Sequence, residues 1–493
     1  MIKSLYDDLG LADDKKFVEG LQSQVLTKKY KLSGVPLKYQ NGTVFTDTSD
    51  AHTLILGNTG SKETRNFCIP SVYTIGMAGE SMVISDPKGE IYRNTSFFLK
   101  KKGYAIKVFN LRNPEQGSKW NPLMLPYKYY KAGDQDKAIE LISDFCMQVK
   151  NQVHHEKDLF WENQAMDLLM GMILILFETE PDENKIHMES IQRIRMYIGL
   201  ETDNADDTNN IFWKMIKTFP ERSLIRFKLA SIYNLRRVEK TLNCVISTFA
   251  SMIRCFLLNK KLMSMTDSSE FDFEEIAKEK TALYLITPDE KTTFHFLVSV
   301  FVKQCYEVFI DYAQKCDNGA LPIRVNYILD EFSNFPQISD MPAMISAARS
   351  RNIRFILVVQ SKQQLTSGYG DSAETIKSNC RTWIYLSCRE LSLLNEISDL
   401  CGTVEINDKE RSVLSITQLQ RLKIGWEDSQ ALILRSGIAP YLSWVNEFSV
   451  YPQAKFEPVP FTKHEIQPTK CFSAPKYMFN ILKAELETGK KKG

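Results

Sequence analysis

Short apolar runs, most of them ending in a polar residue, recur in two separate parts of the chain. They cover residues 54–56, 80–85, 104–110, 281–287, 323–329, 354–360 and 383–387. Segments of helical length and pattern, such as 91–102 and 293–314, lie between them. Strands that alternate with helices pair in parallel, with helices on both faces of the sheet. The pattern therefore predicts an α/β fold with a mostly parallel, doubly wound sheet.

Between about residues 134 and 262 the pattern changes to helical periodicity. Asp134 and Asp158 stand where helix N-caps are expected. Apolar residues recur at spacings of three and four in the segments 136–150, 158–178, 186–198, 209–219 and 235–258. This stretch predicts an all-α domain inserted into the α/β domain.

The composition mainly excludes certain classes of protein and of site. The net charge is +2, so the chain as a whole favours neither a nucleic-acid nor a membrane partner. The ten cysteines include no C-x-x-C pair, which excludes a zinc ribbon and gives no sign of a disulfide scaffold. No secretory signal opens the chain, and the most apolar window, 168–177, is too short to span a bilayer. We expect a soluble, cytoplasmic chain, with His154 and His155 solvated rather than bound to metal.

The turn after the first apolar run carries the main chemical signal. A strand, a glycine-rich loop and a helix N-terminus point backbone N–H groups at one spot, where a phosphate can bind. In the P-loop pattern G-x-x-x-x-G-K-[ST], the lysine reaches the phosphates and the hydroxyl binds Mg²⁺. Here the stretch reads Gly57-Asn58-Thr59-Gly60-Ser61-Lys62-Glu63-Thr64-Arg65.

One position departs from that pattern. Aligned on Gly57, the sequence has Lys62 in place of glycine and Glu63 in place of lysine, while Thr64 stands where the metal-binding hydroxyl is expected. A glutamate there faces a triphosphate with like charge and weakens binding unless Lys62 takes over. Two interpretations stay open: a Gly/Ser/Thr turn that binds no nucleotide, and an altered P-loop.

Two later strands end in polar residues that fit nucleotide chemistry. Asp330 and Glu331 follow one buried run, as in the Walker B motif, where the Asp holds Mg²⁺ and the Glu polarises the attacking water. Gln360 ends the next strand, where RecA-like motors place a γ-phosphate sensor. The alternatives are an ordinary N-cap pair and an ordinary strand end. Asp86 ends an earlier strand at the same predicted edge of the sheet.

Several motifs in a fixed order resemble the TraG/VirD-type coupling proteins of type IV secretion systems. The resemblance runs from about residue 50 to 445. Its motifs are Gly57-Asn-Thr-Gly-Ser, Ser85-Asp-Pro-Lys-Gly-Glu90, Trp120-Asn-Pro122, Phe160-Trp-Glu-Asn163, Leu329-Asp-Glu-Phe332 and Arg349-Ser-Arg351 followed by Val359-Gln-Ser361.

The resemblance implies a RecA-like P-loop domain in an ATPase that uses ATP and Mg²⁺. Carried over by position, Gly57, Asn58, Thr59, Gly60, Ser61, Lys62, Glu63, Thr64 and Arg65 form the nucleotide loop, Thr64 and Asp330 bind the metal, and Glu331, Arg349 and Gln360 are catalytic. Arg349 falls where the family places an interface arginine finger. The cluster of Arg349, Arg351 and Arg354 is equally well explained as a solvated helix end.

The implied domains are a lead-in over 1–50 with a helix at 15–26, a nucleotide-binding domain over 51–130 and 266–460, an all-α domain over 131–265, and a frayed tail over 461–493. Family members act as hexameric, DNA-stimulated ATPases at the cytoplasmic face of the bacterial inner membrane. They pass DNA without sequence preference, with a relaxase or other cargo, to the secretion channel.

The sequence is compatible with three functions. The first is an ATP-dependent coupling protein that recruits DNA or nucleoprotein to a conjugation channel. The second is a non-hydrolysing nucleotide-binding adaptor that docks cargo proteins through the all-α domain, which Glu63 favours and the Asp330-Glu331 pair opposes. The third is a soluble relative with another role in DNA segregation or defence.

Overall fold

The computed structural model describes residues 10–152, 159–198, 210–270, 272–406, 408–426, 428–454 and 457–489. His154 and His155, the expected cap Asp158 and the basic run 490–492 lie outside the described residues. The chain divides into two units. The sheet unit comprises Met1–Arg112, Asp272–His295 and Cys305–Phe461, and the helical unit comprises Asn113–Phe271, Phe296–Gln304 and Thr462–Gly493.

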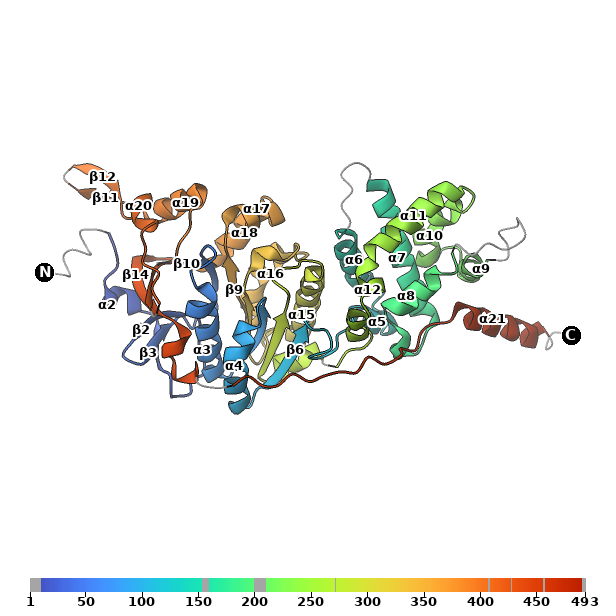
Figure 1. Ribbon diagram of the computed structural model, residues 1–493, viewed down its shortest axis with the longest axis horizontal. Helices are drawn as coiled ribbons and strands as arrows, with labels where there is room; N and C mark the ends of the chain where they lie inside the picture. The colour runs from blue at the N-terminus through green and yellow to red at the C-terminus, as the bar shows by residue number, and fades with distance from the viewer. Residues whose placement is uncertain are drawn as a thin grey trace. The chain divides into compact units, whose positions relative to one another are not determined.

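A nine-stranded sheet forms the centre of the sheet unit (Figure 1). Seven neighbouring strands run in parallel. The two strands beyond them at one edge of the sheet each pair antiparallel with the strand before. The prediction of a mostly parallel, doubly wound α/β sheet is confirmed. The strand order is β14 (Ile438–Asn446), β13 (Asp428–Arg435), β10 (Cys380–Tyr385), β4 (His52–Leu56), β9 (Ile353–Val359), β8 (Val325–Leu329), β5 (Ser81–Asp86), β7 (Thr281–Ile286) and β6 (Ala105–Asn110).

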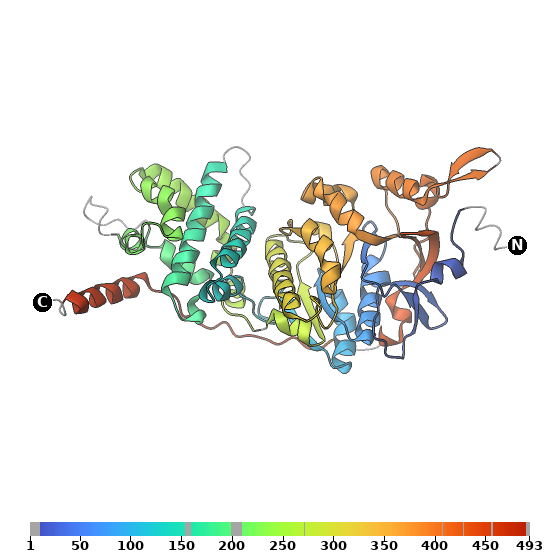
Figure 2. The ribbon, with the colours of Figure 1, turned by 180° about the vertical axis from the view of Figure 1, so that it is seen from behind.

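Helices cover both faces of this sheet, as Figure 1 and, from behind, Figure 2 show. Helices α3 (Ile69–Ala78) and α4 (Glu90–Lys101) share one core with alternate residues of the strands. On the other face the Tyr306 hydroxyl of α15 (His295–Lys315) donates to the Met344 carbonyl of α16 (Met341–Ala348) at 3.0 Å. Burial on both faces explains why the central strands read as continuous apolar runs rather than alternating ones.

The second half of the sheet unit contains elements that the sequence pattern did not indicate. The antiparallel pair β13 and β14 extends the sheet beyond β10. The remaining elements are α14 (Phe273–Lys278), α17 (Lys362–Tyr369), α18 (Ser372–Asn379), α19 (Leu391–Cys401), α20 (Ile416–Leu419) and the hairpin of β11 (Thr403–Ile406) with β12 (Lys409–Ser412).

The predicted helix over 15–26 was wrong. The helix α2 spans only Asp14–Val18, and Gly20, with φ of 76°, turns the chain into the strand β1 (Gln22–Val25). A residue in the left-handed region ends a helix, and glycine adopts it most readily. The strand then forms a three-stranded antiparallel sheet with β3 (Thr43–Thr46) and β2 (Pro36–Gln40).

The helical unit is built around α7 (Leu159–Thr179), against which α6, α8, α10 and α11 pack. Asp134 caps α6 by accepting from the Lys137 N–H, as expected. Helix α10 was not predicted, and the expected helix over 235–258 divides at Ile253. The helices are α5 (Met124–Lys131), α6 (Gln135–Lys150), α8 (Met188–Arg195), α9 (Ile211–Thr218), α10 (Leu224–Leu235), α11 (Glu239–Met252), α12 (Arg254–Leu258), α13 (Lys260–Met265) and α21 (Ala474–Gly489).

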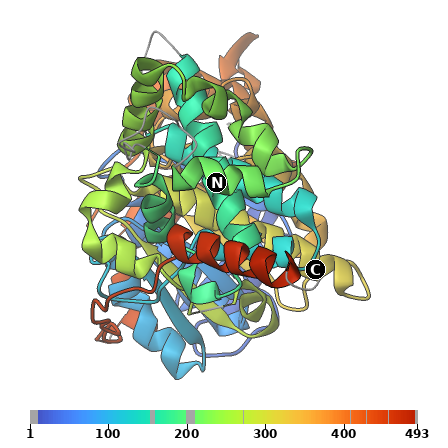
Figure 3. The ribbon, with the colours of Figure 1, turned by 90° about the vertical axis from the view of Figure 1, so that its right-hand side faces the viewer.

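Among the described residues, α7 is the helix whose length and composition would let it cross a membrane. Of its apolar window, 61% is buried inside the protein. All residues from Leu168 to Phe177 are buried, as in the core helix of a soluble protein. The tail was expected to be frayed, but it forms α21, the red helix in Figure 3. This helix packs against α9.

His52, the first residue of β4, makes the stability of the sheet unit depend on pH. Its buried ring accepts from the Phe355 N–H through Nδ1 at 2.9 Å, and Nε2 lies 2.8 Å from the Ile345 carbonyl. Burial, with smaller contributions from Arg349 and Arg354, lowers the pKa of His52 to about 4, against the opposing effects of the Ile345 hydrogen bond and Asp50. Only the unfolded chain therefore gains a proton between pH 6.5 and 4.

This protonation stabilises the unfolded state, so the contribution of His52 is complete above pH 6.5 and is lost as the pH falls. We expect His52 by itself to lower the free energy of unfolding by about 2 kcal/mol between about pH 7.5 and pH 5, whereas the raised pKa values of Asp86 and Asp330 act in the opposite direction. Urea denaturation of the unchanged chain and of His52→Gln at both pH values isolates the effect of His52, because Asp86 and Asp330 contribute equally to both proteins. The same pH dependence in the two proteins would show that His52 makes no such contribution.

Candidate functional site

The predicted chemical residues follow strands β4, β9, β8 and β5, which are adjacent and parallel in the sheet. Gly57 follows β4, Gln360 follows β9, Asp330 follows β8, and Asp86 ends β5. Because parallel strands end at the same edge, these residues gather where open α/β sheets bind ligands.

The loop from Gly57 to Glu63 has the tight turn of a phosphate loop. The Gly57 N–H donates to the Val359 carbonyl at 3.3 Å, and the Asn58 N–H donates to the Ser387 carbonyl at 2.8 Å. A side chain on Gly57 would not fit, since a Cβ there would lie 2.3 Å from the Ser61 hydroxyl. The loop leads into a π-helical turn, η1 (Thr64–Cys68), and then α3.

Lys62 occupies the position at which the P-loop pattern has glycine, and it adopts φ of 67°. Only a small share of non-glycine residues enters this left-handed region. Its ammonium donates to the carbonyls of Gly425 at 2.9 Å and Trp426 at 3.1 Å and lies 4.8 Å from the centre of the Trp426 ring. In this structure, the side chain of Lys62 is therefore held by the 425–426 segment.

The carboxylate of Glu63 folds back into the loop. It accepts from the Ser61 hydroxyl at 2.6 Å, and one of its oxygens lies 2.5 Å from the position that a Cβ on Gly57 would take. The residue is only 8% exposed. Burial raises the pKa of Glu63, and the nearby charge of Glu331 adds to this effect. A carboxyl group of the chain itself thus lies within the loop that the pattern assigns to a phosphate.

Thr64 and Asp330 meet directly. The Thr64 hydroxyl donates to Asp330 Oδ2 at 2.7 Å, which links the start of the helix after the loop to the end of β8. Asp330 is 5% exposed, and the Ser85 hydroxyl donates to its backbone carbonyl at 2.7 Å. A hydroxyl and a carboxylate in contact supply the hard oxygen ligands that Mg²⁺ prefers.

Glu331 and Gln360 flank this pair. Glu331 has φ of 53°, accepts from the Asn334 amide at 2.8 Å and lies 4.0 Å from the Lys88 ammonium. Gln360 accepts from the Thr59 hydroxyl at 3.1 Å, so it contacts the loop. The structure therefore brings these predicted residues together with the loop at one edge of the sheet.

The site concentrates carboxylates at low exposure. Burial, with contributions from Glu331, Glu63 and Asp86, raises the pKa of Asp330 to about 7. Burial also raises the pKa of Asp86 to about 6, although that carboxylate accepts from the N–H groups of Ile91 and Tyr92 at the start of α4. Such an arrangement favours a divalent cation and opposes a phosphate.

Arg65 and the predicted arginine cluster take different positions. Arg65 forms ion pairs with Glu90 and Glu447, so this guanidinium is engaged by α4 and the segment after β14. Arg349 is half exposed and pairs with Asp50 at 3.2 Å. Arg354 is 2% exposed and pairs with Glu80, so the interpretation of this arginine as part of a solvated helix end was wrong. The sequence did contain an indication of this ion pair, because a charged residue near the start of a buried strand needs a partner of opposite charge.

Sequence reasoning missed three residues near the loop. These are Trp426, which is 81% exposed, Lys88 and Glu447. Lys88 belongs to the Asp86-Pro-Lys-Gly-Glu90 turn, which was recognised without a role for the lysine. The other two lie far along the chain, and no local pattern connects them to the loop.

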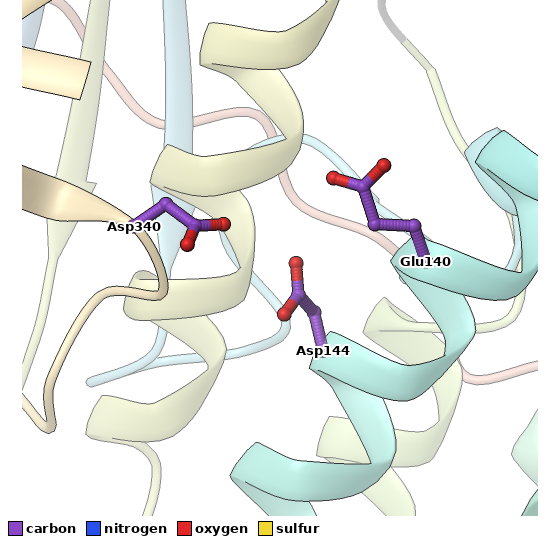
Figure 4. Close-up of side chains that lie close together, drawn as sticks. All are labelled: Glu140, Asp144 and Asp340. Carbon is purple, nitrogen blue, oxygen red and sulfur yellow. The ribbon is translucent and has the colours of Figure 1, made fainter. Parts of the chain in front are cut away.

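Other carboxylates are drawn in Figure 4. Glu140 and Asp144 lie one turn apart on α6, and Asp340 precedes α16 with φ of 58°. Since the first two belong to the helical unit and the third to the sheet unit, we assign no metal site to them.

Comparison with known proteins points to one family. The family model described as type IV secretory system conjugative DNA transfer matches residues 1–431. Protein VirD4 of Rhizobium radiobacter is 19% identical over 408 residues, which cover 80% of this chain and 54% of VirD4. The chain thus spans about half the length of that curated relative.

Solved structures of the plasmid coupling protein TrwB share the fold. The complex with the ATP analogue ADPNP is 14% identical with a TM-score of 0.59, and the match covers 94% of this chain and 96% of that one. The complex with ADP and Mg²⁺ is 15% identical with a TM-score of 0.59, covering 92% and 95%.

Proposed function

This chain belongs to the type IV secretory system conjugative DNA transfer family, and we propose that it is an ATP-dependent coupling protein. It recruits DNA or nucleoprotein to a conjugation channel. The observation that carries the proposal is the contact of Thr64 with Asp330, beside Glu331 and Gln360, at the loop edge of the sheet. A nucleotide-dependent motor needs this combination of metal ligands and water-polarising carboxylate.

A Mg²⁺–nucleotide would supply the phosphoryl group for transfer. In this chain, Thr64 and Asp330 would hold the metal, and the N–H groups of the loop would face the phosphates. Glu331 would accept a proton from the attacking water, and Gln360 would orient it. Arg349, which is half exposed, would supply positive charge from a neighbouring copy. The tight packing over Gly57 and the oxygen ligands fit this assignment.

Glu63 opposes phosphate binding while it is ionised and folded into the loop. Lys62 does not compensate in this structure, because its ammonium contacts the 425–426 segment. The second candidate function follows from these observations: a non-hydrolysing adaptor that docks cargo proteins through the helical unit. The two functions differ in whether ATP turns over, and the site residues are the same.

The family assignment supports further proposals about partners. We infer DNA bound without sequence preference, a relaxase or other secreted cargo, and components of the secretion channel. The active form is a homo-hexamer, as an arginine supplied in trans requires an assembly. TrwB structures contain ADPNP, or ADP and Mg²⁺, which supports a nucleotide and Mg²⁺ as ligands here. The place of action is the cytoplasmic face of the inner membrane.

Titration with a fluorescent ATP analogue, with and without Mg²⁺, tests the proposed site. We expect Mg²⁺ to strengthen binding in the unchanged chain, and Asp330→Asn to abolish that gain because it removes the anionic metal ligand. Asp371→Asn removes the same charge from an exposed position in the same unit and should leave the gain intact. Nucleotide binding that ignores Mg²⁺ in all three proteins would contradict the assignment of Asp330.

A further inference from the structure

One stretch of the helical unit is far more basic than the rest of the chain. Residues 210–261 contain eleven lysines and arginines and two acids, Glu221 and Glu239, so their formal charge is +9, whereas the whole chain has +2. The acids that precede the stretch, Glu201, Asp203, Asp206 and Asp207, lie outside the described residues. The basic residues are Lys214, Lys217, Arg222, Arg226, Lys228, Arg236, Arg237, Lys240, Arg254, Lys260 and Lys261.

Helices α10 and α11 present one polar, basic surface. Their apolar sides, with Leu229 and Ile232 on α10 and Val245 and Phe249 on α11, are buried, and both helices pack against α7. In Figure 1 the two helices and the short turn between them lie at the same side of the helical unit. Exposed polar residues along these two helices and their turn include Ser231, Asn234, Arg237, Lys240, Asn243, Ser247 and Ser251, and the exposed Arg254 follows as the first residue of α12. The exposed acid Glu239 lies between Arg237 and Lys240.

Among the described residues, three cations of this surface have no carboxylate partner. Lys228 on α10 pairs with Asp167, and Lys261 at the end of the stretch pairs with Glu115. Arg237, Lys240 and Arg254 are exposed and form no ion pair within the described parts of the chain. A group of unpaired positive charges, flanked by serine and asparagine side chains, attracts a polyanion.

We propose that this surface, formed by α10, the turn after it, α11 and Arg254 at the start of α12, binds the backbone of single-stranded DNA. Lysine, arginine, serine and asparagine are the side chains that contact phosphates. Phe227 lies one turn before Ser231 on the exposed side of α10 and is 75% exposed, so a base can stack on its ring. An acidic protein would use the charges but would not need this aromatic platform.

The assignment rests on the proposed function in that it takes DNA as the transferred substrate. It adds which unit of the protein binds the DNA strand and which residues contact it. The nucleotide loop belongs to the other unit, so the two sites share no residue.

Fluorescence anisotropy with a labelled oligodeoxythymidine, measured over a series of salt concentrations with the full chain, tests this proposal. The triple variant Arg237→Ala, Lys240→Ala and Arg254→Ala should bind about tenfold or more weakly, and the slope of log affinity against log salt should fall by about 2. The control triple Lys28→Ala, Lys29→Ala and Lys31→Ala removes the same charge from exposed positions of the sheet unit and should change affinity less than twofold.

Phe227→Ala provides the second test, since it leaves the charge unchanged. Single-strand affinity should fall about fivefold or more, while affinity for a duplex of the same length should stay constant. Equal losses in the two triple variants, or equal losses for single strand and duplex with Phe227→Ala, would overturn the proposal. If the unchanged chain binds no DNA, the coupling function itself fails; if DNA binds but the first triple behaves like the control, only this surface is wrong.

Discussion

Replacing Glu63 with lysine is expected to tighten Mg²⁺–ATP binding by about 100-fold or more. The carboxylate lies in the loop beside Ser61 and Gly57, where it repels the phosphates. Replacing the carboxylate with an ammonium turns repulsion of the phosphates into attraction. Each pair of unit charges about 4 Å apart contributes several kcal/mol at the effective dielectric constant of a protein surface. Isothermal titration calorimetry of both proteins with ATP and Mg²⁺ measures the difference.

Two further variants separate charge from shape. Glu63→Gln removes the charge at nearly the same size and should give intermediate affinity. Lys62→Ala should change affinity little, because the Lys62 ammonium contacts the carbonyls of Gly425 and Trp426. Weaker binding in Lys62→Ala than in the unchanged chain would show that Lys62 moves to the phosphates after all.

Replacing Arg354 with methionine is expected to lower the free energy of unfolding by about 3–5 kcal/mol, the cost of leaving a buried charge without its partner. Arg354 pairs with Glu80 at 3.3 Å, and its Nε donates to the Asn326 amide oxygen at 2.8 Å. Both charged residues are at most 3% exposed. Chemical denaturation followed by circular dichroism measures the loss.

The double variant Arg354→Met with Glu80→Gln should recover part of this loss, since the side chain that faced Arg354 is then neutral; Glu80→Gln also removes the carboxylate 3.8 Å from Arg324, so the recovery should be incomplete. Arg349→Met is the matched control: its partner Asp50 is about half exposed, and the expected change is about 1 kcal/mol or less. A loss in the control as large as that of Arg354→Met would show that the buried position is not the cause.

Sequence predicted the centre of the sheet unit well, because its strands are buried on both faces. An apolar run such as the one that precedes Asp330 can only be buried. The acid that follows the run then indicates the carboxyl edge of the sheet. The mostly parallel sheet with its helical insertion followed from the change of period near residue 134. The positions of Thr64 and Asp330 were both read from the chain, and the structure brings them to 2.7 Å.

The errors came from contacts between distant segments. A helix over 15–26 satisfied local propensity, but Gly20 ends it and the next strand pairs with β3. Arg354 looked like part of a solvated cluster, whereas its partner Glu80 lies 274 positions away. The direction of Lys62 depends on Trp426, which no local pattern connects to the loop.

Steady-state phosphate release from ATP, with and without single-stranded DNA, distinguishes an ATP-dependent motor from a non-hydrolysing adaptor. We expect the unchanged chain to release phosphate slowly, Glu63→Lys to release it faster and DNA to stimulate both proteins, whereas adding Glu331→Gln to either protein should remove turnover. If Glu63→Lys binds Mg²⁺–ATP tightly but releases no phosphate with DNA present, the site is not that of a motor. The non-hydrolysing adaptor would then be the function that the site supports.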